Sequence, residues 1–221
     1  MANNTVVLPI DIVIQGSLSA TTFTVPANAV TNASIISTAA IARSKLAQDA
    51  LVKYSIPWHC FKKNDMVTPL PTAGDSTNLG IVAGTHGTAS PMLAGAGANN
   101  NTKTETARFS FALPAEYDAA QTVTLRCHAR VDAVANTSAT LDAQCFESDT
   151  EAGISAELCT TAATTINSTS WANVDFTITA TDLVAGDMLD VELTTVVNDT
   201  GGSGTCKANI GLVQFLLDIR G

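Results

Sequence analysis

The sequence predicts a mainly β protein: a jelly-roll-like antiparallel β-sandwich preceded by an N-terminal arm that is partly extended and partly a short helix. Three observations lead to this prediction. Apolar and polar residues alternate along most of the second half of the chain, which is the pattern of half-buried strands. The segments between the alternating runs are rich in Gly, Pro, Asn and Thr, residues that favour turns. No segment after Ala50 has the length and apolar spacing of a long helix.

The clearest strands lie at residues 109–113, 123–131, 141–145, 174–178 and 189–193. Each has an apolar face and a polar face, as expected for a sheet with one side on the core and one in water. Two more strands are expected in "YSIPWHCFKK", which begins at Tyr54, and in "LGIVAG", which begins at Leu79. Together with the C-terminal segment they make about eight strands, which suits a two-sheet jelly roll.

Two segments of the body are expected to lack regular strands. "AGAGANNNTKT", residues 94–104, has the composition of a loop. Residues 149–165 fit either a short helix or a loop.

The last segment, "NIGLVQFLLDIRG", differs because it is apolar on both faces. One face carries Val213, Phe215, Leu217 and Ile219, and the other is expected to carry Ile210, Leu212 and Leu216. A strand of this kind is typical of a central position with a further layer packed against it. We therefore predict that Leu212 and Leu216 contact a second subunit in a homo-oligomer, expected to be a trimer.

Residues 1–50 are predicted to be an arm, and residues 51–221 the sandwich body. The arm begins with an alternating apolar run that includes Pro9, which favours an edge strand. Residues 27–46 are weakly amphipathic and nearly uncharged, and such a short helix is marginal alone in water. The arm is therefore expected to lie on a partner surface. Its candidate contact residues are Ile10, Ile12, Ile14, Ile35, Ile36, Ile41 and Leu46.

The composition excludes some partners. The chain has a formal net charge of −9 and only 11 Lys and Arg residues among 221, too few for a phosphate-binding surface. No stretch is long and apolar enough for a transmembrane helix, and the N-terminus lacks the basic start of a secretion signal. We expect folding in a reducing cytoplasm, with all five widely spaced cysteines as free thiols.

No catalytic, cofactor-binding or metal-ligating residue is assigned, and the protein is expected not to be an enzyme. His59–Cys60 and Cys127–His128 are adjacent pairs, and neighbours on a strand point to opposite faces. Zinc needs converging ligands, so packing and solvated roles are favoured for both pairs. The sequence contains no G-x-S-x-G or H-E-x-x-H motif.

Two other chemical interpretations stay open. The acidic residues Asp142, Glu147, Asp149, Glu151 and Glu157 favour a solvated edge over a glycosidase carboxylate pair. The oxygen-rich segments "NDTGGSG" and "ESDTE" leave calcium binding open. Four aromatic residues could stack on sugars, but a role as core anchors or interface residues is favoured for them: Tyr54, Trp58, Tyr117 and Trp171.

Two stretches resemble a known class of proteins. "VPANAVTNASIISTAAIARSKLAQ" resembles a phrase near the start of tailed-phage structural proteins, with "VTNA" followed by "AAIARSKL". "WANVDFTITATDLVAGDMLDVELTTVVND" resembles the paired strands of phage jelly-roll proteins, with the turn at Gly186–Asp187 opening a strand. The resemblance implies a capsid decoration (cement) protein: a homotrimer on the exterior of the virion, bound to the major capsid protein and assembled in the bacterial cytoplasm.

Two other function classes compete with this one. A phage fibre or head-appendage protein would bind a host-surface glycan through loops such as 84–104, although no repeats or coiled shaft are present. A hydrolase on a β-sandwich is a more distant alternative, because no convergent acid and base groups can be placed from the sequence.

Overall fold

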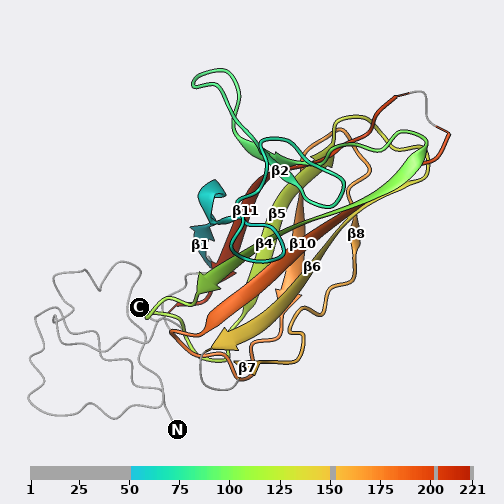
Figure 1. Ribbon diagram of the computed structural model, residues 1–221. Helices are drawn as coiled ribbons and strands as arrows, with labels where there is room; N and C mark the ends of the chain where they lie inside the picture. Colours follow the sequence, from blue (N-terminus) through green and yellow to red (C-terminus); the bar gives the residue numbers. More distant parts are fainter. Residues whose placement is uncertain (1–50, 150–152, 202–203, 220–221) are drawn as a thin grey trace, which may run out of the picture. The chain divides into compact units, whose positions relative to one another are not determined.

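The computed structural model describes residues 51–149, 153–201 and 204–219 (Figure 1). The predicted arm and its candidate contact residues Ile10, Ile12, Ile14, Ile35, Ile36, Ile41 and Leu46 lie outside these ranges. Within them, no helix has the length and hydropathy needed to cross a membrane.

The described residues form eleven strands and one turn of 3-10 helix. In order, these are β1 (Val52–Ser55), η3 (Trp58–Cys60), β2 (Gly80–Val82), β3 (Met92–Ala94), β4 (Asn101–Ala112), β5 (Val123–Val131), β6 (Ser138–Asp149), β7 (Gly153–Ile154), β8 (Thr164–Thr165), β9 (Ala172–Ile178), β10 (Met188–Asp199) and β11 (Ala208–Leu217).

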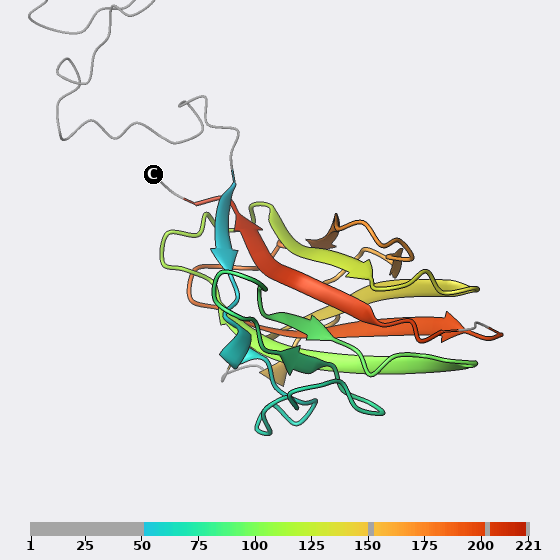
Figure 2. The same ribbon diagram turned by 90° about the horizontal axis from the view of Figure 1, so that it is seen from above.

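The strands form two antiparallel sheets. Sheet A has the order β2-β3-β11-β5-β9, and β1 pairs with β11. Sheet B has the order β4-β10-β6-β7, and β8 pairs with β6. The long strands alternate between the sheets along the chain: β4 in B, β5 in A, β6 in B, β9 in A, β10 in B and β11 in A. This arrangement confirms the predicted jelly-roll-like β-sandwich, and Figure 2 shows β4, β10 and β6 running side by side.

One hydrophobic core fills the space between the sheets. On β5, burial alternates strictly along the strand, and every second residue from Val123 to Val131 is at most 2% exposed. Rings from both sheets meet in this core: Phe215 of β11 stacks on Phe111 with centroids 4.5 Å apart and lies 6.3 Å from Phe109. Each fully buried apolar side chain of this size contributes about 1.5–3 kcal/mol.

A β-bulge on β11 corrects one prediction. Ile210 pairs with Ala129 and Leu212 with His128, so Gly211 is the extra residue in the ladder. As a result Ile210 points into the core and is 0% exposed, whereas Leu212 stays on the outer face and is 37% exposed. The expectation that Ile210 shares the outer face with Leu212 was wrong, because a bulge interrupts the period of two.

The outer face of β11 is partly covered within the chain itself. Leu216, a predicted subunit contact, is only 6% exposed. Near the bulge, the ring of Trp171 lies over Gly211, where a Cβ would be 3.0 Å from a ring carbon. The contact of Leu212 and Leu216 with a second subunit stays a prediction.

The predicted first strand is shorter than expected. Strand β1 ends at Ser55, and Trp58–Cys60 is a 3-10 turn that starts after Pro57. Pro57 has no N–H to donate to a sheet ladder.

The predicted loop at 94–104 and the segment at 149–165 also differ from expectation. Strand β4 begins at Asn101 because every residue from Asn101 to Ala112 pairs with β10. Within the described part of 149–165, the only regular elements are the end of β6 and the short strands β7 and β8, so the helix alternative does not hold there.

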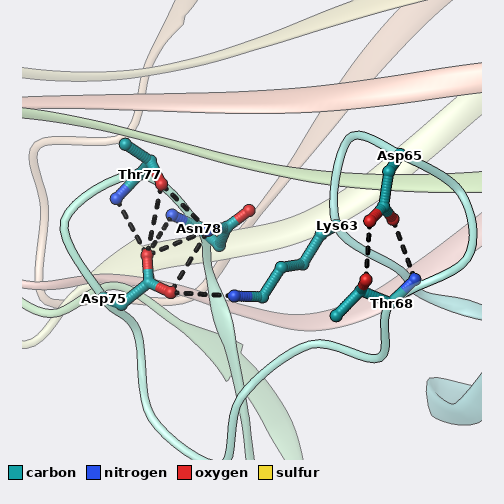
Figure 3. A network of polar contacts seen from close by, with 6 residues as sticks. All are labelled: Lys63, Asp65, Thr68, Asp75, Thr77 and Asn78. Atoms are coloured by element: carbon teal, nitrogen blue, oxygen red, sulfur yellow. Dashed lines mark hydrogen bonds and ion pairs between the residues drawn. The ribbon is translucent and has the colours of Figure 1, made fainter.

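The loop between η3 and β2 is held by two carboxylates (Figure 3). Asp75 accepts hydrogen bonds from the backbone N–H groups of Thr77 at 2.9 Å and Asn78 at 2.8 Å, and its second oxygen lies 3.4 Å from Nζ of Lys63. The hydrogen bond from Thr77 is the main reason that the pKa of Asp75 is lowered. Asp65 fixes Thr68 in a similar turn.

This loop covers part of the free edge of β4. Lys62 and Arg108 exchange backbone hydrogen bonds of 2.8 and 3.0 Å, and the N–H of Leu79 donates to the carbonyl of Thr106 at 2.9 Å. The covered strand edge is therefore less available for pairing with another chain. The same loop brings the backbone carbonyl of Asn64 within hydrogen-bonding distance of the Arg108 side chain.

Candidate binding cleft

A cleft of about 390 Å³ lies on the outer face of sheet B, and we call it the sheet B cleft. It is lined by Asn64, Arg108, Gln144, Phe146, Ile154, Asp190 and Glu192. The strand register explains why these residues meet. On β10, Glu192 lies between Arg108 of β4 and Gln144 of β6. Two residues along β10, and on the same face, Asp190 lies opposite Phe146.

A fixed ion pair forms the polar floor of the cleft. Arg108 donates from Nε to Asp190 Oδ1 at 2.7 Å and from its Nη2 to Asp190 Oδ2. Its Nη1 donates to the backbone carbonyl of Asn64 at 2.8 Å. The hydrogen bonds to Asp190 raise the pKa of Arg108 above its ordinary value. This bidentate geometry holds the guanidinium plane in one orientation.

Glu192 differs from Asp190 in its partners. Its carboxylate is half-buried and accepts no hydrogen bond from any residue that the structure describes. Burial is the main cause that raises the pKa of Glu192; the negative charge of Asp190 adds to this, and Arg108 opposes it. Glu192 is thus an acceptor facing the cleft with unused hydrogen-bonding capacity.

One side of the cleft is apolar. Phe146 is half-buried, and Ile154 of β7 is 66% exposed. Ile154 pairs with Ser148 of β6 and therefore lies at the same end of the cleft as Phe146, which is on that strand. Phe146 follows Asp142 and Gln144 on the water-facing side of β6. It breaks the polar pattern of that face, and this break is the one signal in the sequence that could have located the apolar wall.

The residues predicted for subunit contact lie elsewhere. Leu212 and Leu216 are on β11 in sheet A, and they do not line the sheet B cleft. The loops at 84–104 do not line it either; Thr85–Pro91 surround a separate hollow of about 450 Å³. The mixed apolar and charged cleft therefore does not lie in the loops for which a glycan site was predicted.

The remaining candidate groups separate into core and surface roles. Cys127 is fully buried, while His128 faces outward and its Nδ1 lies 2.9 Å from the side-chain oxygen of Asn173. Both placements were predicted. His59 and Cys60 belong to a 3-10 turn and not to a strand, so the opposite orientation of strand neighbours does not hold for them. Among the described residues, no three His, Cys, Asp or Glu side chains gather as a metal site would require.

The acidic residues of the candidate carboxylate group lie partly next to the cleft and partly outside the described residues. Gln144 donates to Glu157 at 3.5 Å next to the cleft, whereas the side chain of Asp149 and all of Glu151 lie outside the described residues.

Two of the aromatic residues have different environments. Tyr117 is 1% exposed, which confirms a core role. Trp171 is 37% exposed on sheet A, stacked 5.4 Å from His128.

Comparisons with known proteins give distant structural similarities only. No protein-family model matches the sequence, and no curated protein matches it. Three of the similar solved structures are a family 61 carbohydrate-binding module in complex with β-1,4-galactotriose, the xylan-binding domain of a Paenibacillus barcinonensis protein, and a family 30 module of a Clostridium thermocellum cellulase. Their sequence identities are 8, 13 and 10%, and their TM-scores are 0.36, 0.38 and 0.39. The alignments cover 58, 76 and 77% of this chain and 71, 94 and 94% of those chains. Similarity at this level assigns no function to the protein.

Proposed function

We propose that the protein is a non-catalytic, glycan-binding β-sandwich and that the sheet B cleft holds the sugar. The observation that carries this proposal is the meeting of an apolar wall, Phe146 and Ile154, with the Arg108–Asp190 pair and Glu192 in one cleft. A sugar ring has apolar C–H faces and a polar edge of hydroxyl groups. Such a ligand needs both kinds of surface, with the polar groups at fixed positions.

The cleft is suited to binding with little rearrangement. Its floor is built from three hydrogen-bonded strands, and Arg108 is already held by Asp190 and by the carbonyl of Asn64. Groups that are ordered before binding lose little conformational entropy when a ligand arrives. The volume of about 390 Å³ lies within the usual range for small-ligand clefts.

The test is a screen of immobilised glycans, followed by titration calorimetry of the best binders. Phe146→Ala removes the aromatic part of the apolar wall, and we expect it to weaken binding by about tenfold, as for an aromatic contact residue that carries a large share of the binding energy. Val67→Ala is the matched control, because Val67 is 78% exposed and does not line the cleft. Melting temperatures check that both variants fold. Absence of glycan binding by the wild type, or equal binding by the two variants, would overturn the proposal.

A second proposed function is the capsid decoration role. Its support is the resemblance of residues 25–48 and 171–199 to phage structural proteins, together with the net charge of −9, which suits an outer surface better than one facing packaged DNA. It predicts a homotrimer that binds the major capsid protein. Native mass measurement and sedimentation with undecorated shells test it, and a monomer that leaves shells bare would refute it.

A further inference from the structure

The sheet B cleft carries an uncompensated negative charge. Among its lining residues, Arg108 is the only cation, and it is bound to Asp190 through two hydrogen bonds. Glu192 is then left without a counter-charge of its own. Two further carboxylates adjoin the lining residue Gln144: Asp142 lies two residues before it on β6, and Glu157 accepts a hydrogen bond from its side chain.

From this charge balance we propose that the cleft selects a sugar carrying a protonated amine, with Glu192 as the carboxylate that receives the ammonium group. The inference rests on the proposed glycan-binding function and names the ligand class for the same cleft. A hydrogen bond from an ammonium to a carboxylate is stronger than one between neutral groups.

The apolar wall favours the same ligand. A cation near the face of an aromatic ring is attracted by the ring, and Phe146 lies on the neighbouring strand, two residues beyond the partner of Glu192. A sugar with a carboxylate would instead meet Glu192, while the one cation of the lining is already paired with Asp190, and like charges at close range are unfavourable. A neutral sugar would leave the capacity of Glu192 for a charged partner unused.

The selection should depend on pH. The charged groups around Glu192 are Arg108 from β4, Asp190 from β10, Asp142 from β6 and Glu157 from the segment after β7. Because the pKa of Glu192 is raised by its burial, its carboxylate protonates at a higher pH than an ordinary glutamate. The preference for the amine is therefore expected to fall as the pH is lowered, with Glu192 losing its charge before exposed carboxylates do.

The experiment compares three β-1,4-linked trisaccharides that differ only at C2: glucosamine, N-acetylglucosamine and glucose. Titration calorimetry is run as a series from about pH 5 to pH 7, because the amine of the ligand must be protonated and Glu192, whose pKa is raised, must be ionised for the ion pair to form. We expect the glucosamine trimer to bind wild type at least about tenfold more tightly than the other two, as for one added hydrogen bond to a charged group. Glu192→Gln should remove this difference. Glu116→Gln is the matched control, because Glu116 is exposed in the β4–β5 connection and does not line the cleft.

The outcomes separate the inference from the function on which it rests. If wild type binds no glycan at all, the proposed function fails. If wild type binds all three trimers equally, or if Glu192→Gln keeps the preference, glycan binding stands and the amine selection is wrong. A short lysine peptide is included as a fourth ligand, and binding as tight as that of the glucosamine trimer would overturn the assignment to a sugar. The wild-type comparison needs no variant, so a folding defect in Glu192→Gln would not remove the test.

Discussion

The β-bulge at Gly211 places its two neighbours on opposite faces of β11, and alanine substitutions at both positions test this placement. Ile210 is 0% exposed and packs in the core, whereas Leu212 is 37% exposed on the outer face of sheet A. A regular strand would instead place both side chains on the same face. The two variants Ile210→Ala and Leu212→Ala remove similar apolar volume from positions two residues apart.

The expected effects differ in size. Removal of a fully buried Ile side chain leaves a cavity, and such substitutions cost about 2–5 kcal/mol. Leu212 already meets water, so its truncation should cost about 1 kcal/mol or less, as for partly exposed positions. For a domain of this size, 1 kcal/mol changes the melting temperature by about 2–4 °C. Ile210→Ala should therefore melt roughly 4–20 °C lower than wild type, and Leu212→Ala no more than about 4 °C lower.

Chemical and thermal unfolding, followed by circular dichroism at one low protein concentration, measure both variants. The low concentration keeps any subunit contact of Leu212 from adding to the result. Equal losses of stability in the two variants would refute the bulge and restore the regular alternation of β11. A larger loss for Leu212→Ala than for Ile210→Ala would reverse the assignment of the two faces.

Further predictions concern single residues and the arm. Burial is the main cause that raises the pKa of Glu105. The protonated carboxyl therefore contributes stability below the ordinary pKa of 4.5, and this stability is lost as the pH rises through the raised pKa. Glu105→Gln should melt at a higher temperature than wild type at pH 8 but not at pH 4. Cys127 is fully buried, and burial raises the pKa of Cys145 to about 12, so neither thiol should react with a thiol reagent in the native protein, and two intact disulfides by mass spectrometry would contradict this. Leu212→Asp should disrupt a trimer in native mass spectra; an unchanged assembly would place the contact elsewhere. Deletion of residues 1–50 should leave a folded body that no longer binds undecorated shells, and undiminished shell binding would exclude the arm as the anchor.

The sequence determined the long strands of the body and which face of each strand is buried. Alternation is a local property, because successive side chains on a strand point to opposite sides. Cys127 in the core and His128 on the surface were placed correctly for this reason. The same property failed at Ile210, because one inserted residue reverses the faces; the local signal for it was Gly211, a glycine inside a strand pattern.

The ends of the elements depended on long-range pairing. Asn101 begins β4 although its neighbourhood has the composition of a loop, because β10 supplies a partner for each residue from Asn101 to Ala112. Trp58–Cys60 left the predicted strand for a 3-10 turn next to Pro57. At Asn101 tertiary context overrode the local preference of the sequence, whereas at Trp58–Cys60 the cause is local, because Pro57 has no N–H to donate to a sheet ladder.

The cleft was decided by the tertiary structure alone. Arg108 and Asp190 are 82 residues apart in the chain, and their ion pair exists because β4 and β10 lie side by side in one register. Phe146 reaches the same place from β6, the strand on the other side of β10. The sequence marks each of these residues as facing water, but which strands become neighbours is set by contacts of high sequence separation, which a pattern with a period of two does not encode.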